Sequence, residues 1–422
     1  MNETLSSQTI ALNLARAARD AARTVATATT AQKNSALEAI AKRLEESKAA
    51  ILEANALDLK AADEGGLSAA MVDRLRLDDA RIAAMISGVR SVIELPDPIG
   101  RREPMGPRPN GLEVARIRIP LGVICIIYES RPNVTVDAGV LCLKSGNAPI
   151  LKGGKEAFHS NGALVSAMRA GLEDAGLPAD AIQAVATSDR EVIGALIRAD
   201  EFVDLVIPRG GEGLIRHITA NATVPVIQHY KGVCHVYVHE AADQDMAAEI
   251  AFNAKVQRPG VCNAMETLLV DEAIAAWFLP KILERYKRAG VTVRADARAR
   301  SIWPEAEAAT EADWDEEYLD LTVAVRIVGG LESALDHIAR HGSGHTESIV
   351  TEDQSASDRF LREATASCVM HNASTRFNDG FELGLGAEIG ISTSRLHAFG
   401  PMGLEELTTR KFVVLGDGQI RS

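Results

Sequence analysis

The stretch Val123-Ile-Cys-Ile-Ile-Tyr128 decides the fold, because it is a short apolar run bounded by a glycine on one side and polar residues on the other. Four further runs of this kind follow, at Ala148–Leu151, Ile182–Ala186, Phe202–Ile207 and Val224–Ile227. Helix-like stretches separate them, at residues 135–145, 155–176, 189–199 and 213–221. Short apolar strands that alternate with helices indicate a parallel, doubly wound sheet. Right-handed crossovers then place ligands at the carboxyl ends of those strands.

Before this region the pattern is different. Residues 8–94 carry apolar residues at helical spacing, Leu12 and Ala15 among them, and are expected to form helices. The chain between residues 96 and 111 is rich in proline and glycine, which favours a loop. Leu112–Ile119 then alternates apolar and charged residues, so we expect a half-exposed strand or one arm of a hairpin.

A second α/β unit is expected to begin near Cys234. Its predicted strands and helices are His235–Val238, 243–255, 267–270, 273–288, Leu321–Val328 and 331–340. Residues 296–317 are acidic and rich in alanine, so they are expected to be a solvated surface segment. The tail Phe412–Leu415 is predicted to be a short strand that pairs with the 112–119 arm or with another subunit.

The composition, with 46% hydrophobic and 24% charged residues, is that of an ordinary soluble globular protein. At 422 residues the chain exceeds a single hydrophobic core, so two or three domains are expected. The net charge of −13 argues against nucleic acid or an anionic membrane as a partner. Apolar runs all fall short of the roughly 18 residues that span a bilayer.

The N-terminal 31 residues combine alanine and arginine with Glu3 and Asp20, which favours a cytoplasmic amphipathic helix over a targeting segment. The five cysteines are odd in number and widely spaced, which fits a reducing compartment without a disulfide framework. Cys125 and Cys142 lie in apolar or helix-like stretches and are expected to be core residues.

The stretch Lys255-Val-Gln-Arg-Pro-Gly-Val-Cys262 presents one thiol at a connection between two elements. Pro259-Gly260 ends the preceding helix, and an apolar strand follows the cysteine. Lys255 and Arg258 are close in sequence, and nearby cations lower the pKa of a thiol towards the reactive thiolate. This stretch alone leaves open the alternative of a buried, inert cysteine.

Two other stretches follow predicted strands in a way that suits a phosphate. Lys152 and Lys155 come directly after a strand and are three residues apart, where they can clamp a phosphate. Gly210, Gly211 and Gly213 lie between a strand and a helix, in a turn that can place backbone N–H groups against a pyrophosphate. The turn lacks the G-x-G-x-x-G spacing, so solvated lysines and a tight connection without a ligand remain the alternatives.

Two groups of histidines have spacings that suggest a metal, but neither is expected to bind one. In the first group, glycines end the predicted helix before the third histidine, so the three need not share a face. The second group straddles a loop and a strand without a carboxylate cluster. The groups are His337, His341 and His345, and His229, His235 and His239.

Taken together, these segments resemble the aldehyde dehydrogenase superfamily over nearly the whole chain. The superfamily signal is Ile119-Pro-Leu-Gly-Val-Ile124, then Lys152, then a glycine turn, then the nucleophile Cys262. Four narrower strings resemble the branch that reduces L-glutamate 5-phosphate in proline biosynthesis. They are Tyr128-Glu-Ser-Arg-Pro-Asn-Val-Thr135, Gln257-Arg-Pro-Gly-Val-Cys-Asn263, Asn372-Ala-Ser-Thr-Arg-Phe377 and Gly400-Pro-Met-Gly-Leu-Glu-Glu-Leu-Thr-Thr409.

The resemblance implies an aldehyde dehydrogenase-like α/β fold with a Rossmann-like cofactor domain, an α/β catalytic domain and a small β oligomerisation arm. The cofactor domain is expected at 1–108 and 120–232, the catalytic domain at 233–398, and the arm and tail at 109–119 and 399–422. The implied partners are a small-molecule substrate, further copies of the chain in a homo-oligomer, and the upstream glutamate 5-kinase.

The resemblance also implies roles for single residues. Cys262 is expected to be the nucleophile, and either Asn133 or Arg131 is expected to point at the reacting carbonyl. Cofactor binding is expected of Lys152, Lys155, Gly210, Gly211, Gly213 and Glu317. Substrate binding is expected of Arg131, Arg258, Asn372, Ser374, Thr375 and Arg376. Of these, Arg131 and Arg258 are the candidates that would bind the leaving phosphate.

Two departures from the superfamily pattern refine the expected activity. Hydrolytic members carry Glu-Leu-Gly-Gly, whose glutamate activates water, whereas the matching string here is His229-Tyr-Lys-Gly232. A thioester on Cys262 would then lack its usual water activator, which suits reduction. Lys155 stands where NAD-preferring members often place a glutamate, and lysine attracts a 2′-phosphate, so NADPH/NADP is the implied cofactor. A coenzyme A-acylating dehydrogenase, a hydrolytic dehydrogenase and a non-catalytic scaffold remain the alternatives.

Overall fold

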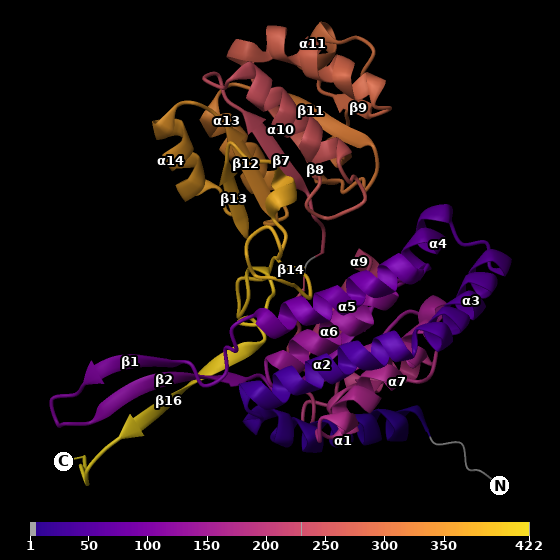
Figure 1. Ribbon diagram of the computed structural model, residues 1–422. Coiled ribbons are helices and arrows are strands. Elements are labelled where there is room, and N and C mark those ends of the chain that lie inside the picture. The colour runs from indigo at the N-terminus through magenta and orange to yellow at the C-terminus, as the bar shows by residue number, and fades with distance from the viewer. Residues whose placement is uncertain (1–5, 229, 422) are drawn as a thin grey trace. The chain divides into compact units, whose positions relative to one another are not determined.

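The computed structural model describes residues 6–228 and 230–421 (Figure 1). The chain forms two compact units, each described here by itself. The first unit comprises Met1–Gln228, Leu385–Gly390 and Met402–Ser422, and the second comprises His229–Gly384 and Ile391–Pro401. Residues 385–390 thus belong to the first unit, which differs from the continuous domain expected over 233–398.

Five helices open the first unit, as the pattern of residues 8–94 predicts. They are α1 (Ser7–Thr27), α2 (Thr30–Glu46), α3 (Lys48–Glu64), α4 (Ala69–Leu75) and α5 (Asp79–Glu94). All except α3 begin after a Ser, Thr or Asp whose side chain accepts a backbone N–H of the first turn. Such caps stabilise the helix start, so local sequence sets these boundaries.

The centre of the first unit is a parallel four-stranded sheet in the order β5-β4-β3-β6. Its strands are β3 (Val123–Tyr128), β4 (Ala148–Lys152), β5 (Gln183–Ala184) and β6 (Leu205–Arg209). The helices that follow them are α6 (Pro132–Lys144), α7 (Phe158–Asp174), α8 (Arg190–Leu196) and α9 (Glu212–Asn221). All six residues of β3 are buried, and alternate ones, such as Cys125, pack with α1 and α8. The predicted doubly wound sheet is confirmed.

Two of the predicted strands are shorter than expected. β5 covers only two residues of 182–186, and Val224–Ile227 contributes a single parallel bridge from Val226 to Val206. Pro225 has no N–H to donate, which limits pairing at that position. Cys125 and Cys142 are fully buried, as expected of core residues.

A separate antiparallel sheet joins β1 (Arg102–Pro107), β2 (Glu113–Pro120) and β16 (Thr408–Leu415), with β2 in the middle. Phe412 of β16 pairs with Arg116 of β2, so the tail strand pairs with the arm of its own chain. The loop expected between residues 96 and 111 is wrong, because it contains β1. Proline is tolerated there because β1 is an edge strand, where a missing N–H costs little.

The second unit contains a parallel sheet of seven strands in the order β10-β9-β11-β8-β7-β12-β13. The strands are β7 (Cys234–Val238), β8 (Met265–Asp271), β9 (Thr292–Ala295), β10 (Glu307–Ala308), β11 (Thr322–Val328), β12 (Thr346–Val350) and β13 (Cys368–His371). The helices are α10 (Gln244–Val256), α11 (Glu272–Arg288), α12 (Ala297–Ile302), α13 (Leu331–His341) and α14 (Gln354–Glu363). Val236 and Val238 pack with α10 and α11, whereas Tyr237 packs with α13 and α14, so helices cover both faces (Figure 1).

The expectation of a solvated surface segment at residues 296–317 is confirmed for most of its residues, which are exposed, but the segment also has regular structure and a few buried side chains. The segment contains α12, β10 and the 3-10 turn η3 (Glu311–Asp315), and Trp314 is buried. Asp313 is also buried, and its carboxylate accepts hydrogen bonds from Arg294 at 2.7 Å and from Tyr318 at 2.9 Å. The acidic composition of the segment does not predict these buried residues, because a few inward-facing side chains are enough to anchor it. Among the described helices, none combines the length and apolar character that crossing a bilayer requires.

Candidate active site

Cys262 lies in the second unit, in the loop that joins the end of α10 to the start of β8, and is partly exposed. Gly232 lies against this loop, since a Cβ at Gly232 would stand 2.1 Å from the carbonyl oxygen of Cys262. Cys234, at the start of β7, donates its S–H to the same oxygen with an Sγ–O distance of 3.1 Å. The backbone of the cysteine is therefore held by the residues that lead into β7.

Accessibility separates Cys262 from the buried thiols of the chain. Burial raises the pKa of Cys125 to about 12, and burial also raises the pKa of Cys142 and of Cys234. Cys368 is partly exposed, but burial raises its pKa as well. Thiols of this kind stay protonated at neutral pH and react slowly. Cys262 is thus the accessible thiol that sits on a connection between two elements.

Lys255, expected as one of the cations near the Cys262 thiol, is instead paired with a carboxylate. Its ammonium is fully buried and lies 2.6 Å from the carboxylate of Glu266, which is also fully buried. The structure offers Arg376 in its place. Burial and the charge of Arg258 lower the pKa of Arg376, whereas the charges of Asp379, then of Cys262, raise it. Arg258, Arg376 and Cys262 are therefore close enough to interact electrostatically.

The loop that carries Asn372, Ser374, Thr375 and Arg376 leads into the 3-10 turn η4 (Thr375–Phe377). Asn372 has a left-handed φ of 53°. Its side-chain oxygen accepts the backbone N–H of Thr351 at 2.9 Å, and its side-chain NH₂ donates to the backbone carbonyl of Thr351 at 3.0 Å. Ser374 accepts the N–H of Arg376, and Thr375 is fully buried. Asn372 and Ser374 thus hold the loop in shape, and Arg376 is the member that reaches the cysteine loop.

Three residues that the sequence analysis missed connect η4 to the cysteine loop. Arg376 donates through Nε to Oε1 of Gln257 at 2.9 Å. Asn263 donates through Nδ2 to the carbonyl of Asn378 at 2.9 Å. Asn263 follows Cys262 directly in one of the recognised strings, so that string held a signal. No sequence signal points to Asn378, because its contact with Asn263 arises from tertiary packing.

The first unit holds the lysines expected to bind a cofactor. Lys152 ends β4, is only 7% exposed and donates to the carbonyl of Gly153 at 2.7 Å, and burial lowers its pKa. Lys155 begins the short 3-10 turn η1 (Lys155–Ala157) and is exposed. Glu156, which the sequence analysis did not single out, accepts the backbone N–H of Ser130 at 2.7 Å. That bond ties the turn after β4 to the turn after β3.

The three glycines lie between β6 and α9, where the carboxyl end of the strand meets the start of the helix. A Cβ at Gly210 would stand 2.7 Å from the carboxyl carbon of Glu129, so a side chain there would displace the end of the Glu129 side chain. A Cβ added at Gly213 would meet no atom within 4 Å. The N-cap of α9 is Gly211, which has no side chain to cap the helix, and its own N–H donates to a carboxylate oxygen of Glu129 at 3.2 Å. The start of a helix is a place where an anion can bind. This turn and the two lysines fit the phosphates of a nicotinamide dinucleotide.

Arg131 and Asn133 lie at the start of α6 in the first unit, with Arg131 at the N-cap. Asn133 is exposed and donates to the carboxylate of Asp137 at 3.0 Å. Glu317 lies in the second unit and is partly buried. The roles of these three residues therefore remain predictions.

The histidines of the first predicted group do not all share a helix face. The rings of His337 and His341 lie 4.6 Å apart on α13, whereas His345 follows the helix and lies 3.6 Å from Sγ of Cys234. Burial lowers the pKa of His337 to about 2. In the described part of the chain, no three His, Cys, Asp or Glu side chains are placed to hold a metal ion.

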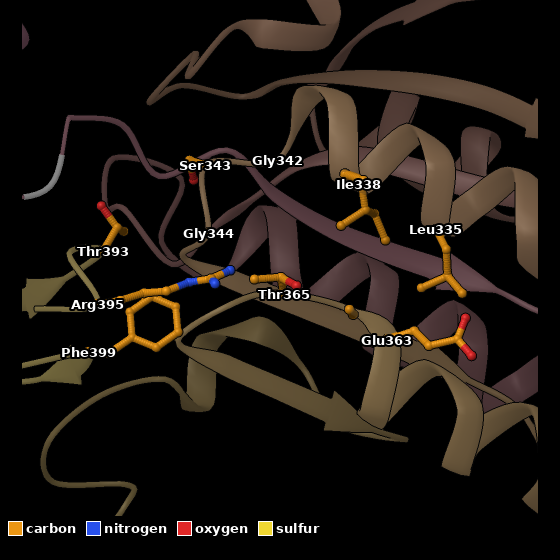
Figure 2. Close-up of a pocket in the computed structure, with 12 residues that line it drawn as sticks. Leu335, Ile338, Gly342, Ser343, Gly344, Glu363, Thr365, Thr393, Arg395 and Phe399 are labelled. Atoms are coloured by element: carbon orange, nitrogen blue, oxygen red, sulfur yellow. The ribbon is translucent and has the colours of Figure 1, made fainter.

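A cavity of about 420 Å³ lies within the second unit, between α13, α14 and the segment that follows β14 (Ile391–Ser392). Figure 2 shows Arg395 and Phe399 on one side of it and Leu335 and Ile338 on the other. None of the predicted site residues lines this cavity.

Known proteins resemble the chain over its whole length. The model of the aldehyde dehydrogenase family matches residues 4–301. The gamma-glutamyl phosphate reductase of Desulfatibacillum aliphaticivorans is 55% identical over 98% of this chain and 99% of its own, and that of Moorella thermoacetica is 56% identical over 96% and 97%. The crystal structure of the Thermotoga maritima gamma-glutamyl phosphate reductase matches with a TM-score of 0.96 at 48% identity, over 98% of this chain and 100% of that one. The chain belongs to the aldehyde dehydrogenase family and, within it, to the gamma-glutamyl phosphate reductases.

Proposed function

We propose that the chain reduces L-glutamate 5-phosphate to L-glutamate 5-semialdehyde and phosphate in proline biosynthesis, with NADPH as reductant and Cys262 as nucleophile. The observation that supports this best is the partly exposed Cys262 thiol, which lies on a loop tied to the arginine of η4. Relatives at 55% and 56% identity carry the name of this activity. Members of the family use a nicotinamide cofactor.

In the acylation step the Cys262 thiolate attacks the acyl carbon of the substrate. The new C–S bond forms as the C–O bond to phosphate breaks, and phosphate leaves with the electron pair of that bond. The positive charges of Arg376 and Arg258 stabilise the Cys262 thiolate before the attack. After the attack they stabilise the departing phosphate dianion, because the guanidinium group matches phosphate geometry. The backbone N–H of Cys262 and the amide of Asn133 are the proposed donors to the oxyanion.

In the reduction step the Cys262 thioester is the electrophile. The nicotinamide cofactor supplies hydride when bound. The resulting thiohemiacetal collapses to the aldehyde and returns the thiolate to Cys262. Lys152 and Lys155 hold the adenosine-side ribose and its 2′-phosphate, the glycine turn before α9 holds the pyrophosphate, and Glu317 holds the nicotinamide-side ribose.

The proposed specificity for reduction over hydrolysis rests on the string His229-Tyr-Lys-Gly232. It has no glutamate where hydrolytic members carry the residue that activates water. His229 lies outside the residues that the structure describes. A thioester without a water activator persists until hydride or phosphate reaches it.

Phosphate dependence of the reverse reaction tests this proposal. With semialdehyde and NADP⁺ in phosphate-free buffer, we expect a burst of at most about one NADPH per subunit, because the acyl-enzyme accumulates. Added phosphate should convert the burst into steady turnover. Steady turnover without phosphate would favour a hydrolytic enzyme, and rescue by coenzyme A instead of phosphate would favour an acylating one. Absence of both NADPH formation and Cys262 acylation would favour a scaffold.

The β1-β2-β16 sheet is proposed to be the oligomerisation arm of a homo-oligomer. Phe412 and Val414 of its edge strand β16 are 62% and 53% exposed, and exposed apolar edge strands favour pairing with another copy. The chain is proposed to act in the cytoplasm, where its five free cysteines would stay reduced. The upstream glutamate 5-kinase is a proposed partner, because direct transfer would protect a reactive acyl phosphate from water.

A further inference from the structure

A fully buried ion pair closes the base of the cysteine loop and has no part in the reaction described above. Lys255 lies in the last turn of α10, and Glu266 is the second residue of β8. The ammonium of Lys255 and Oε2 of Glu266 are 2.6 Å apart, and both side chains are 0% exposed. The pair therefore joins the two ends of the segment that carries Cys262.

The same carboxylate also holds the segment that carries Glu317. Oε1 of Glu266 accepts the backbone N–H of Leu319 at 3.3 Å. Leu319 has a φ of 52°, in the left-handed region that residues other than glycine rarely adopt. An acceptor buried beneath such a residue helps to hold the strained turn. Glu266 thus connects the cysteine loop to the turn that begins at Glu317.

Electrostatics make this connection hard to rearrange. The charges of Glu266 and of Asp320 both act on Lys255, and the charge of Glu317 acts on Glu266. The ring of Tyr318 lies 5.9 Å from the Lys255 ammonium. Burial raises the pKa of Glu266 to about 8 and lowers that of Lys255, whereas the charge of each favours the charged form of the other. Loss of one member would therefore destabilise the other or leave it neutral.

We propose that Lys255 and Glu266 are positioning residues that couple the cysteine loop to the Glu317 turn. The inference rests on the proposed contact between Glu317 and the nicotinamide-side ribose. A ribose held by Glu317 orders the turn, and Leu319, Glu266 and Lys255 transmit that order to the loop of Cys262. Coupling between two sites is reciprocal in binding free energy, so a modification of Cys262 that fixes the loop should also change the affinity for the cofactor.

The test measures the rate at which iodoacetamide alkylates Cys262, by mass spectrometry of the full chain, with and without saturating NADP⁺. In the wild type we expect NADP⁺ to change this rate about fivefold or more, the lower range of measured couplings. Lys255→Met with Glu266→Leu removes the pair without leaving a buried charge. In this double variant NADP⁺ should still bind, but the ratio of the two rates should fall close to one.

Two controls separate coupling from a general loss of structure. Lys33 and Asp97 form another buried pair, in the first unit, with an N–O distance of 2.5 Å. Lys33→Met with Asp97→Asn should lower the melting temperature and leave the alkylation ratio unchanged. If Lys255→Met with Glu266→Leu does not fold, Lys255→Met alone takes its place, because burial raises the pKa of Glu266 to about 8 and the carboxyl can then take up a proton. The ratio of the two rates should again fall towards one.

The outcomes distinguish this inference from the proposed function. A full NADP⁺ effect in the pair variant, equal to that of the wild type, would overturn the coupling, because the cofactor would then act by shielding Cys262 directly. Wild-type protein that turns over with NADPH but shows no NADP⁺ effect on alkylation would also overturn it. Failure of the wild type to bind NADP⁺ at all, measured by calorimetry, would overturn the proposed cofactor and the coupling together.

Discussion

Gly232 lies so close to Cys262 that a side chain at this position would occupy the same space as the backbone of the cysteine. A Cβ at Gly232 would stand 2.1 Å from the carbonyl oxygen and 2.8 Å from the Cα of Cys262. Both contacts are to backbone atoms, which cannot rotate away as the end of a side chain can. Gly232, two residues before β7, thus helps to decide where the nucleophile sits.

Gly232→Ala should therefore move the Cys262 loop. A displacement of about 1 Å in a reacting group can cost on the order of a hundredfold in rate, so we expect a loss of that order in kcat. Steady-state kinetics would measure it. Gly88→Ala is the matched control, because Gly88 lies in the interior of α5 with no atom within 4 Å of its added Cβ. This control should keep full activity and gain about 0.5–1 kcal/mol in stability. Normal kcat in Gly232→Ala would contradict the packing argument.

Cys262→Ser should abolish turnover and leave cofactor binding intact, because a serine hydroxyl without an adjacent base is a poor nucleophile. Turnover and NADPH binding would be measured on the same preparation. Cys125→Ser is the control: it buries a hydroxyl in the core and should lower the melting temperature while activity remains. Residual catalysis in Cys262→Ser above the background of contaminating wild type would exclude the covalent mechanism.

Lys155→Glu should shift cofactor preference from NADPH towards NADH. The exposed ammonium of Lys155 is the proposed contact for the 2′-phosphate, and its loss should cost roughly 1.5–3 kcal/mol, which is tenfold or more in affinity. The measurement is the ratio of kcat/KM for the two cofactors. Lys60→Glu, an exposed lysine of α3, should leave the ratio unchanged. If Lys155→Glu also leaves it unchanged, the 2′-phosphate lies elsewhere, and Lys152 is the next residue to test.

Arg376→Met should make Cys262 less reactive at neutral pH. The charge of Arg376 interacts favourably with that of Cys262, so its removal leaves the thiolate less stabilised. The pH dependence of alkylation should then shift towards higher pH, because the thiolate has lost a neighbouring positive charge. The rate of iodoacetamide alkylation across a pH series would show the shift. Arg376→Lys keeps the charge and should restore most of the profile. A profile identical to that of the wild type would show that Arg376 does not activate the thiol.

Much of the architecture was determined by neighbouring residues. The apolar run of β3, the helical spacing of α1 and the proline and glycine before Cys262 each specify a local conformation within one element. Those signals survive in a single sequence because they depend on residues a few positions apart. The recognised strings, through the family resemblance that they carry, predicted Cys262 and Arg376 as site residues.

Tertiary structure alone decided how those pieces act together. Lys255 lies next to the cysteine loop in sequence, yet packing turns it towards Glu266 and away from the role of a free cation. Trp314 is buried although its surroundings in sequence are acidic. Gly232 packs against the backbone of Cys262, and the carbonyl of Asn378 accepts a hydrogen bond from Asn263, so both residues act on parts of the chain that are distant in sequence. Local sequence cannot specify such contacts, because burial and charge pairing depend on which distant elements the completed sheet brings together.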